Sequence, residues 1–167
     1  MAPLRSLMNR LESCVAADLE GQRRIAAALG AVQEAVLRRD REALGASGAA
    51  LEREVAGGRR RNAQRTTVLA ALAAHWNVAR PALTLRSVAE RFGPGVLGGP
   101  GEPGAERLLA LRDDLRAASA EVVRASRRTF ALLALHRDLL RETLELLLGA
   151  SGENPLEVEG AILDAEG

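Results

Sequence analysis

The sequence predicts an all-α protein. Of its 167 residues 47% are hydrophobic, but only 2% are aromatic and tyrosine is absent. Leucine, alanine, arginine and glutamate favour helices, and all four are frequent, whereas the aromatic residues of strand-rich cores are scarce. Apolar residues also recur at steps of three, four or seven, which is the spacing of the buried face of a helix. With 27% charged residues, this composition is typical of one folded domain and not of a disordered chain.

The first two helices are expected on either side of Asp40. Apolar residues follow the helical spacing from about Leu4 to Arg39, and the pattern is loosest at Gly21, where it allows a local bend. Asp40 is of a residue type that caps helices, and it precedes a second helix that ends near Trp76. Each glycine inside a helix costs about 1 kcal/mol relative to alanine. We therefore expect fraying or a break in the first half of the second helix, which contains Gly45, Gly48, Gly57 and Gly58.

A short helix and a third long helix complete the expected layout. Thr84 is placed to cap a short helix over residues 85–92, and the Gly/Pro-rich residues 93–104 predict a loop. The third long helix should run from near Ala105 to Gly149, a glycine suited to the position after a helix end. Residues 151–167 contain five acidic residues and no cation, which predicts a flexible acidic tail after a single helical domain over residues 1–150.

The apolar stripe of the third long helix widens after residue 130. Three long helices with one short accessory helix predict an elongated antiparallel bundle or coiled coil, and the widened stripe is either its core, closed by the first helix, or a docking surface. A docking surface would receive an amphipathic helix of another protein. Its contacts would come from six apolar side chains and from arginines at the rim: Phe130, Leu133, Leu139, Leu140, Leu144 and Leu147, with Arg128, Arg137 and Arg141.

The sequence offers little support for catalysis, for a cofactor or for a metal site. His75 lies beside Trp76 at the end of the second helix, and His136 is the only other histidine; neither is accompanied by a cluster of cysteines or carboxylates. Cys14 lies on the first apolar stripe without a histidine partner, so a buried apolar role is favoured. The phosphate-binding and nucleophile motifs of common enzyme classes are absent. We expect a protein that is not an enzyme.

Charge and cysteine content bear on partners and location. The formal net charge is +1, so the whole chain has no electrostatic preference for nucleic acids or membranes. The run Arg59-Arg60-Arg61, with Arg65 one turn later, has the charge to grip phosphates, but stacking aromatics are missing and a solvated helix face is favoured. One cysteine, no signal-peptide pattern and no apolar stretch of about 18 residues predict a cytoplasmic protein.

Three segments of this layout resemble the FlgN family of flagellar type III export chaperones. The segment Ala35-Val36-Leu37-Arg38-Arg39-Asp40-Arg41-Glu42-Ala43-Leu44 is similar to the family's pattern of an apolar pair, Asp and Ala-Leu. Leu83-Thr84-Leu85-Arg86-Ser87-Val88-Ala89 resembles its mid-chain segment, and Leu144-Glu145-Leu146-Leu147-Leu148-Gly149 its closing leucine-rich turn. Ser126 and Thr129 stand where the family usually has two asparagines.

The resemblance implies a cytoplasmic chaperone for the hook-associated proteins of the flagellum. Such a chaperone binds the C-terminal helical segment of its cargo and delivers it to the type III export apparatus. The cargo-binding part of the family corresponds here to about residues 127–148, and a monomer or weak dimer is expected. Two other interpretations stay open: a structural coiled-coil protein that associates with itself, and a binder of nucleic acid or anionic lipid through Arg59 to Arg61.

Overall fold

The computed structural model describes residues 2–80, 83–91 and 104–152, which form four helices and no strand. The helices are α1 (Ala2–Arg38), α2 (Arg41–His75), α3 (Leu85–Arg91) and α4 (Gly104–Gly152). The all-α prediction is confirmed. The chain divides into two compact units, residues 1–129 and residues 130–167. The predicted loop, apart from its last residue, and the predicted tail, apart from its first two, lie outside the described residues.

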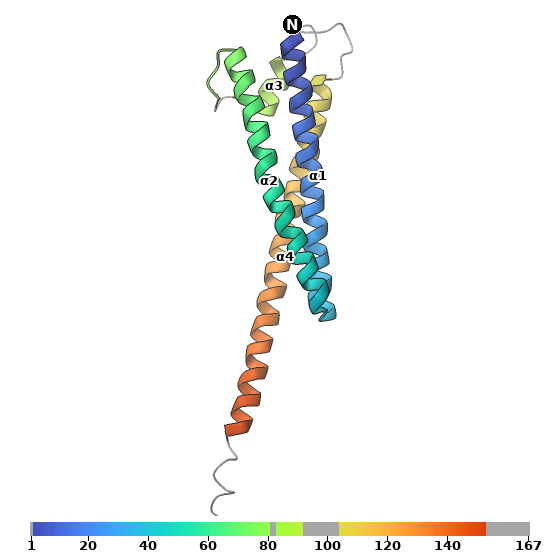
Figure 1. Ribbon diagram of the computed structural model, residues 1–167, viewed down its shortest axis with the longest axis vertical. Helices are drawn as coiled ribbons and strands as arrows, with labels where there is room; N and C mark the ends of the chain where they lie inside the picture. Colours follow the sequence, from blue (N-terminus) through green and yellow to red (C-terminus); the bar gives the residue numbers. More distant parts are fainter. Residues whose placement is uncertain (1, 81–82, 92–103, 153–167) are drawn as a thin grey trace, which may run out of the picture. The chain divides into compact units, whose positions relative to one another are not determined.

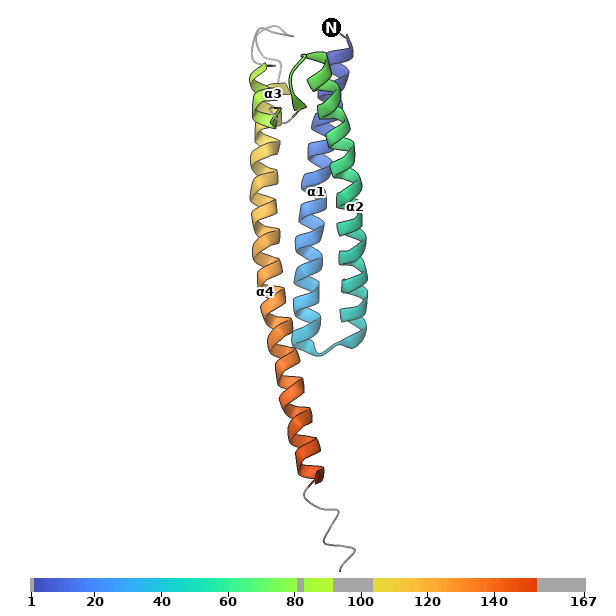
Figure 2. The same ribbon diagram turned by 90° about the vertical axis from the view of Figure 1, so that its left-hand side faces the viewer.

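The first unit is built on an antiparallel hairpin of α1 and α2. Both views show the two helices side by side, with their connection at the end remote from the N-terminus (Figures 1 and 2). Helix α3 lies near the start of α1, and the first part of α4, residues 104–129, runs along the hairpin in the direction of α1 (Figure 2). Four helical segments therefore share one unit.

The buried face of α1 follows a heptad pattern. One set of positions, at steps of seven, consists of Leu4, Leu11, Asp18, Ile25 and Val32, and all five side chains are buried. A second set, also at steps of seven, alternates with it: Met8, Val15, Gln22, Leu29 and Val36. A repeat of seven with two buried positions is the pattern of a coiled-coil seam. Near the middle of the seam two polar residues replace apolar ones, Asp18 and Gln22.

The core consists of two apolar clusters, one on each side of this polar position. The larger cluster joins the start of α1, the end of α2, α3 and the start of α4, with Leu11, Leu72 and Leu108 completely buried. The smaller cluster joins Ile25 and Leu29 of α1 to Ala125 of α4. Burying a side chain of leucine size contributes about 1.5–3 kcal/mol, so the larger cluster contributes most of the stability of this unit.

The predicted N-caps are confirmed. The Asp40 carboxylate accepts a hydrogen bond of 2.9 Å from the backbone N–H of Ala43, at the start of α2. Before α3, the Thr84 hydroxyl accepts a bond of 3.1 Å from the N–H of Ser87, whose own hydroxyl accepts one of 2.9 Å from the N–H of Thr84. Each cap satisfies N–H groups that have no partner within the helix.

Of the two expected effects of the glycines, fraying or a break, the break is wrong, because α2 is one helix from Arg41 to His75. Tertiary packing supplies most of the stability of a helix in a folded protein and outweighs the low propensity of glycine. In α2, Gly57 is buried and Glu54 forms an ion pair of 2.8 Å with Arg24 of α1. The expected end of the third long helix at Gly149 is also wrong, because α4 continues to Gly152.

A residue with left-handed backbone follows the end of both α1 and α2, and in neither case is it glycine. The φ angle is 56° at Arg39 and 50° at Asn77. After α1, the N–H of Asp40 donates to the carbonyl of Ala35 at 2.9 Å and the N–H of Arg39 to Val36 at 3.1 Å, which is the Schellman arrangement. Both residues have a Cβ that disfavours this conformation, but the short polar side chain of asparagine can offset the cost by bonding to the local backbone, whereas that of arginine does not.

We predict that Arg39→Gly raises the free energy of unfolding by about 1 kcal/mol, because glycine has no Cβ to strain the left-handed conformation. The matched control is Arg39→Ala, which removes the same exposed side chain but keeps the Cβ. Urea denaturation followed by circular dichroism measures both variants. Equal stabilisation by glycine and alanine would assign the effect to the arginine side chain instead.

Candidate functional site

The candidate docking residues lie on α4, and all of them except Arg128 belong to the second unit. We call residues 130–148 the leucine-rich segment. All six predicted apolar contacts are exposed, and the exposed fraction of the residue ranges from 40% at Leu133 to 76% at Phe130. Core residues of the first unit are below 10% exposed. Within the part of the chain that the structure describes, these six residues are therefore not part of a core. Large apolar side chains that the prediction omitted are exposed as well: Leu135, Leu146 and Leu148.

The leucines of this segment form two stripes along the helix. Each residue of an α-helix is rotated by about 100° from the one before it. On this basis one set falls on a common face, which we call the first stripe: Phe130, Leu133, Leu140, Leu144, Leu147 and Leu148. The other set falls on an adjacent face, which we call the second stripe: Leu132, Leu135, Leu139 and Leu146. The predicted contact Leu139 thus lies on a different face from the other five.

A shallow groove of about 510 Å³ follows the first stripe. Its apolar lining comes from Leu133, Leu140, Leu144 and Leu148, and Arg137 lies among them. The Arg137 guanidinium is 2.8 Å from the carboxylate of Asp138, so the methylene groups of this arginine contribute to the groove while its charge is paired elsewhere.

Each predicted rim arginine has a carboxylate partner on its own helix. Arg128 contacts Glu121 at 2.9 Å, in the first unit, and Arg141 contacts Glu145 at 2.8 Å. Hydrogen bonds from Arg124 and Arg128 lower the pKa of the Glu121 carboxyl and thereby favour its charged form. Exposed pairs of this kind contribute about 0–1 kcal/mol, so an incoming partner can exchange them at low cost.

Thr129 is the last residue of the first unit. Its side chain is 5% exposed, and its hydroxyl accepts a hydrogen bond of 2.8 Å from the Gln33 carboxamide of α1 and donates one of 2.9 Å to the carbonyl of Ala125. Ser126 is exposed. Of the two residues that replace the expected asparagines, Thr129 therefore has a packing role.

Two of the residues considered for catalysis or metal binding, Cys14 and Trp76, pack against the core. Cys14 packs against the larger core cluster, and burial is the main reason that the pKa of its thiol is raised, with the Asp18 carboxylate adding to the effect. Trp76 packs on the same cluster, and the Arg91 guanidinium lies 5.5 Å from the centre of its ring. His75 is exposed. Within the described ranges no three His, Cys, Asp or Glu side chains are grouped to hold a metal ion.

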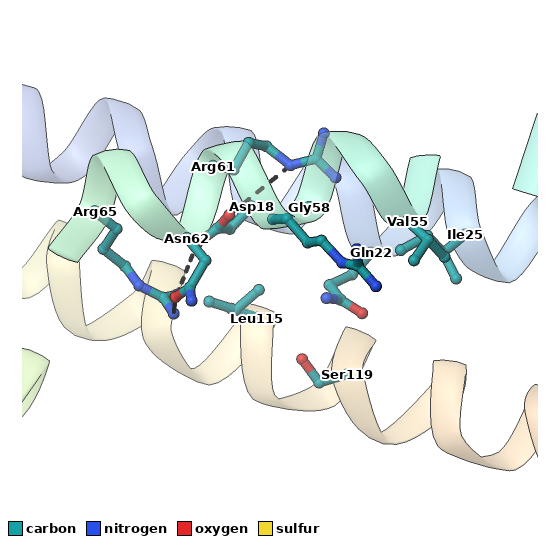
Figure 3. A pocket seen from close by; sticks show the side chains of 11 residues that line it. Asp18, Gln22, Ile25, Val55, Gly58, Arg61, Asn62, Arg65, Leu115 and Ser119 are labelled. Atoms are coloured by element: carbon teal, nitrogen blue, oxygen red, sulfur yellow. Dashed lines mark hydrogen bonds and ion pairs between the residues drawn. The ribbon is translucent and has the colours of Figure 1, made fainter. Parts of the chain in front are cut away.

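Sequence reasoning missed a buried charge cluster around Asp18. The Asp18 carboxylate of α1 is 2.6 Å from Arg65 Nη1 and 3.8 Å from Arg61 Nε, both on α2 (Figure 3). Burial raises the pKa of the Asp18 carboxyl, and the charges of Arg65 and Arg61 oppose this without cancelling it. The signal was present, because Asp18 stands on the heptad position of Leu11 and Ile25.

Arg61 and Arg65 do not lie on a solvated helix face, as the sequence had suggested. The side chain of Arg61 is 16% exposed and that of Arg65 is 28% exposed. The guanidinium of Arg61 occupies space that a Cβ at Gly21 would need, so glycine at this buried position of α1 admits the arginine. The Arg61 Nε is buried and has no hydrogen-bond partner, which leaves the pairing with Asp18 incomplete.

A pocket of about 420 Å³ opens beside this cluster, between α1, α2 and α4. Gln22, Asn62 and Ser119 line it together with the arginines, and the Gln22 carboxamide and the Ser119 hydroxyl face the same space (Figure 3). Two of the predicted phosphate-gripping cations, Arg61 and Arg65, are already engaged by Asp18. The charge cluster around Asp18 therefore joins α1 to α2 within the hairpin.

Comparison of the chain with protein-family profiles, with curated proteins and with solved structures found no match. Among the described residues, no helix combines the length and the apolar character that crossing a membrane requires.

We predict that Asp18→Ala lowers the free energy of unfolding by about 2 kcal/mol or more, because two partly buried guanidinium groups lose their shared carboxylate. The control is Glu34→Ala, which removes a pair with Arg38 between largely exposed side chains and should change stability by less than about 0.5 kcal/mol. Urea denaturation measures both. Equal midpoints for the two variants would show that the cluster does not hold the hairpin together.

We also predict opposite effects for two glycines of α1. Gly21→Ala should lower the melting temperature, because its methyl group collides with the Arg61 guanidinium. Gly30→Ala should raise stability by up to about 1 kcal/mol, because its methyl group meets no atom within 4 Å and alanine favours the helix. Thermal unfolding of the two variants tests this. A stabilised Gly21→Ala variant would mean that Arg61 is free to leave its position.

Proposed function

We propose that this protein is a non-enzymatic binding protein, a cytoplasmic flagellar export chaperone for hook-associated proteins. The observation that supports the proposal is the leucine-rich segment, on which nine large apolar side chains are exposed along one helix. Apolar surface of this extent on a protein generally marks an interaction site. The resemblance of three sequence segments to the FlgN family supplies the class of cargo.

The proposed mechanism is reversible burial of an aggregation-prone segment. The cargo's C-terminal helical segment packs on the leucine-rich segment, which hides the apolar surface of the cargo and prevents premature polymerisation before export. The first unit, as an elongated antiparallel bundle, would be the scaffold. Because the rim arginines have partners on their own helix, apolar contacts supply most of the affinity, and the charges of Arg137 and Arg141 act on the rate of encounter.

Self-association is the second candidate function, and the same exposed leucines favour it. A second copy of the chain would cover the segment in a symmetric interface. The structure gives less support to a binder of nucleic acid or anionic lipid, because Arg61 and Arg65 already contact the Asp18 carboxylate.

We predict that the double variant Leu140→Ser, Leu144→Ser binds a purified hook-associated protein at least about tenfold more weakly, because both leucines line the groove. Isothermal titration calorimetry measures the affinity. Helicity and melting temperature should be preserved, because both side chains are more than half exposed. The control is Leu37→Ser, which removes a leucine of α1 that is also more than half exposed and should leave binding unchanged.

Two results would contradict the proposal. Loss of helical structure in the double variant would identify the leucines as core residues. Sedimentation of the purified chain as a tight dimer that fails to bind hook-associated proteins would favour self-association.

A further inference from the structure

We propose that the partner of the leucine-rich segment presents two helices, as a helical hairpin, with one helix on each stripe. The inference rests on the proposed function and specifies the form of the binding partner. Three observations carry it: the width of the apolar surface, the continuity of the first stripe with a face that already packs on a helical hairpin, and the beginning of the second stripe near residue 130.

The apolar surface of the segment is wider than a single helix covers. At about 100° per residue, the two stripes together span roughly 220° of the helix circumference. An apolar face that packs on one neighbour spans about 100°. The remaining arc is polar and contains Asp138, Arg141, Glu142 and Glu145, with Ala131 and Ala134 between them. One partner helix would therefore leave the second stripe in water.

The first stripe continues a face that already packs on two helices. In residues 104–129, this face of α4 carries Leu108 and Leu115, which pack in the larger core cluster, and Val122, which packs against the smaller cluster. The helices that cover it are α1 and α2, which form an antiparallel hairpin (Figure 1). The same spacing of three and four leads on to Leu133, Leu140 and Leu144. Within the protein, this face of α4 is therefore covered by a helical hairpin.

The second stripe begins only after the first unit ends. In residues 104–129 the corresponding face carries charged residues, among them Asp114, Glu121 and Arg128. After residue 130 the same face carries leucines: Leu132, Leu135, Leu139 and Leu146. A face that needed only to be soluble would have kept its charges. The change indicates that a second helix packs on this face, and only in this part of the chain.

The occupant is accordingly an antiparallel pair of amphipathic helices from one partner protein. Its two apolar faces meet the two stripes. Strong charges on its edges are not required, because Arg137 and Arg141 are each paired with a carboxylate of their own helix at 2.8 Å. A single amphipathic helix and a second copy of this chain are the competing occupants, and each predicts a different pattern of contacts.

Photo-crosslinking of the full-length chain to a purified hook-associated protein tests the inference. A photoreactive phenylalanine analogue replaces Leu144 on the first stripe, Leu139 on the second stripe, or Ala131 on the polar arc as the control. We expect crosslinks from positions 144 and 139 to map to two different helical segments of the same partner molecule, with only background from position 131. Leu135→Ser with Leu139→Ser should weaken binding about as much as Leu133→Ser with Leu140→Ser, roughly tenfold or more each.

Each other outcome overturns the inference in a recognisable way. Crosslinks from both stripes to one partner segment, or unchanged binding after replacement of Leu135 and Leu139, would show a single-helix partner and leave the proposed function intact. Crosslinks from position 139 to another copy of this chain would assign the second stripe to self-association. Failure of the unsubstituted chain to bind any hook-associated protein would overturn the proposed function together with the inference.

Discussion

The pairing of the Asp18 carboxylate with Arg65 and Arg61 is the constraint on which the register of the α1–α2 hairpin depends. A carboxylate in the middle of an apolar seam is costly unless cations reach it, and the observed alignment of α1 and α2 brings both arginines to it. Burial raises the pKa of this carboxyl and the two arginines oppose this without cancelling it, so the pairing offsets only part of the cost of burying the charge. The apolar clusters on either side contribute most of the stability.

Helix α4 uses one pattern of residues for two purposes. Over residues 104–129 its apolar face packs into the core, where Leu108 is completely buried. Over residues 130–148 the same spacing continues, but its leucines are exposed and a second stripe joins them. A helix that serves as part of a core and as a proposed binding surface needs no separate binding motif. This explains why the chain has so few features that resemble a functional site.

Local signals were sufficient for much of the fold. Asp40 and Thr84 cap helices because their side chains accept hydrogen bonds from N–H groups only three residues further along the chain. A short stretch of sequence therefore contains both partners of each cap. The predicted break at the glycines of α2 is wrong because contacts with α1 hold the helix together. The residues of α1 that make these contacts lie far away along the chain, so local sequence does not reveal them. Arg61 was assigned to a solvated face for the same reason, since its carboxylate partner is more than forty residues away along the chain.

The sequence by itself determined the all-α class, the helix caps and the leucine-rich segment, because composition and periodicity act over a few residues. Only the tertiary structure decided which apolar residues are buried. Leu108 and Leu144 are 36 residues apart, which is ten whole turns of an α-helix, yet one is completely buried and the other is 57% exposed. Helical spacing specifies the direction in which a side chain points, whereas its burial depends on what packs against that face.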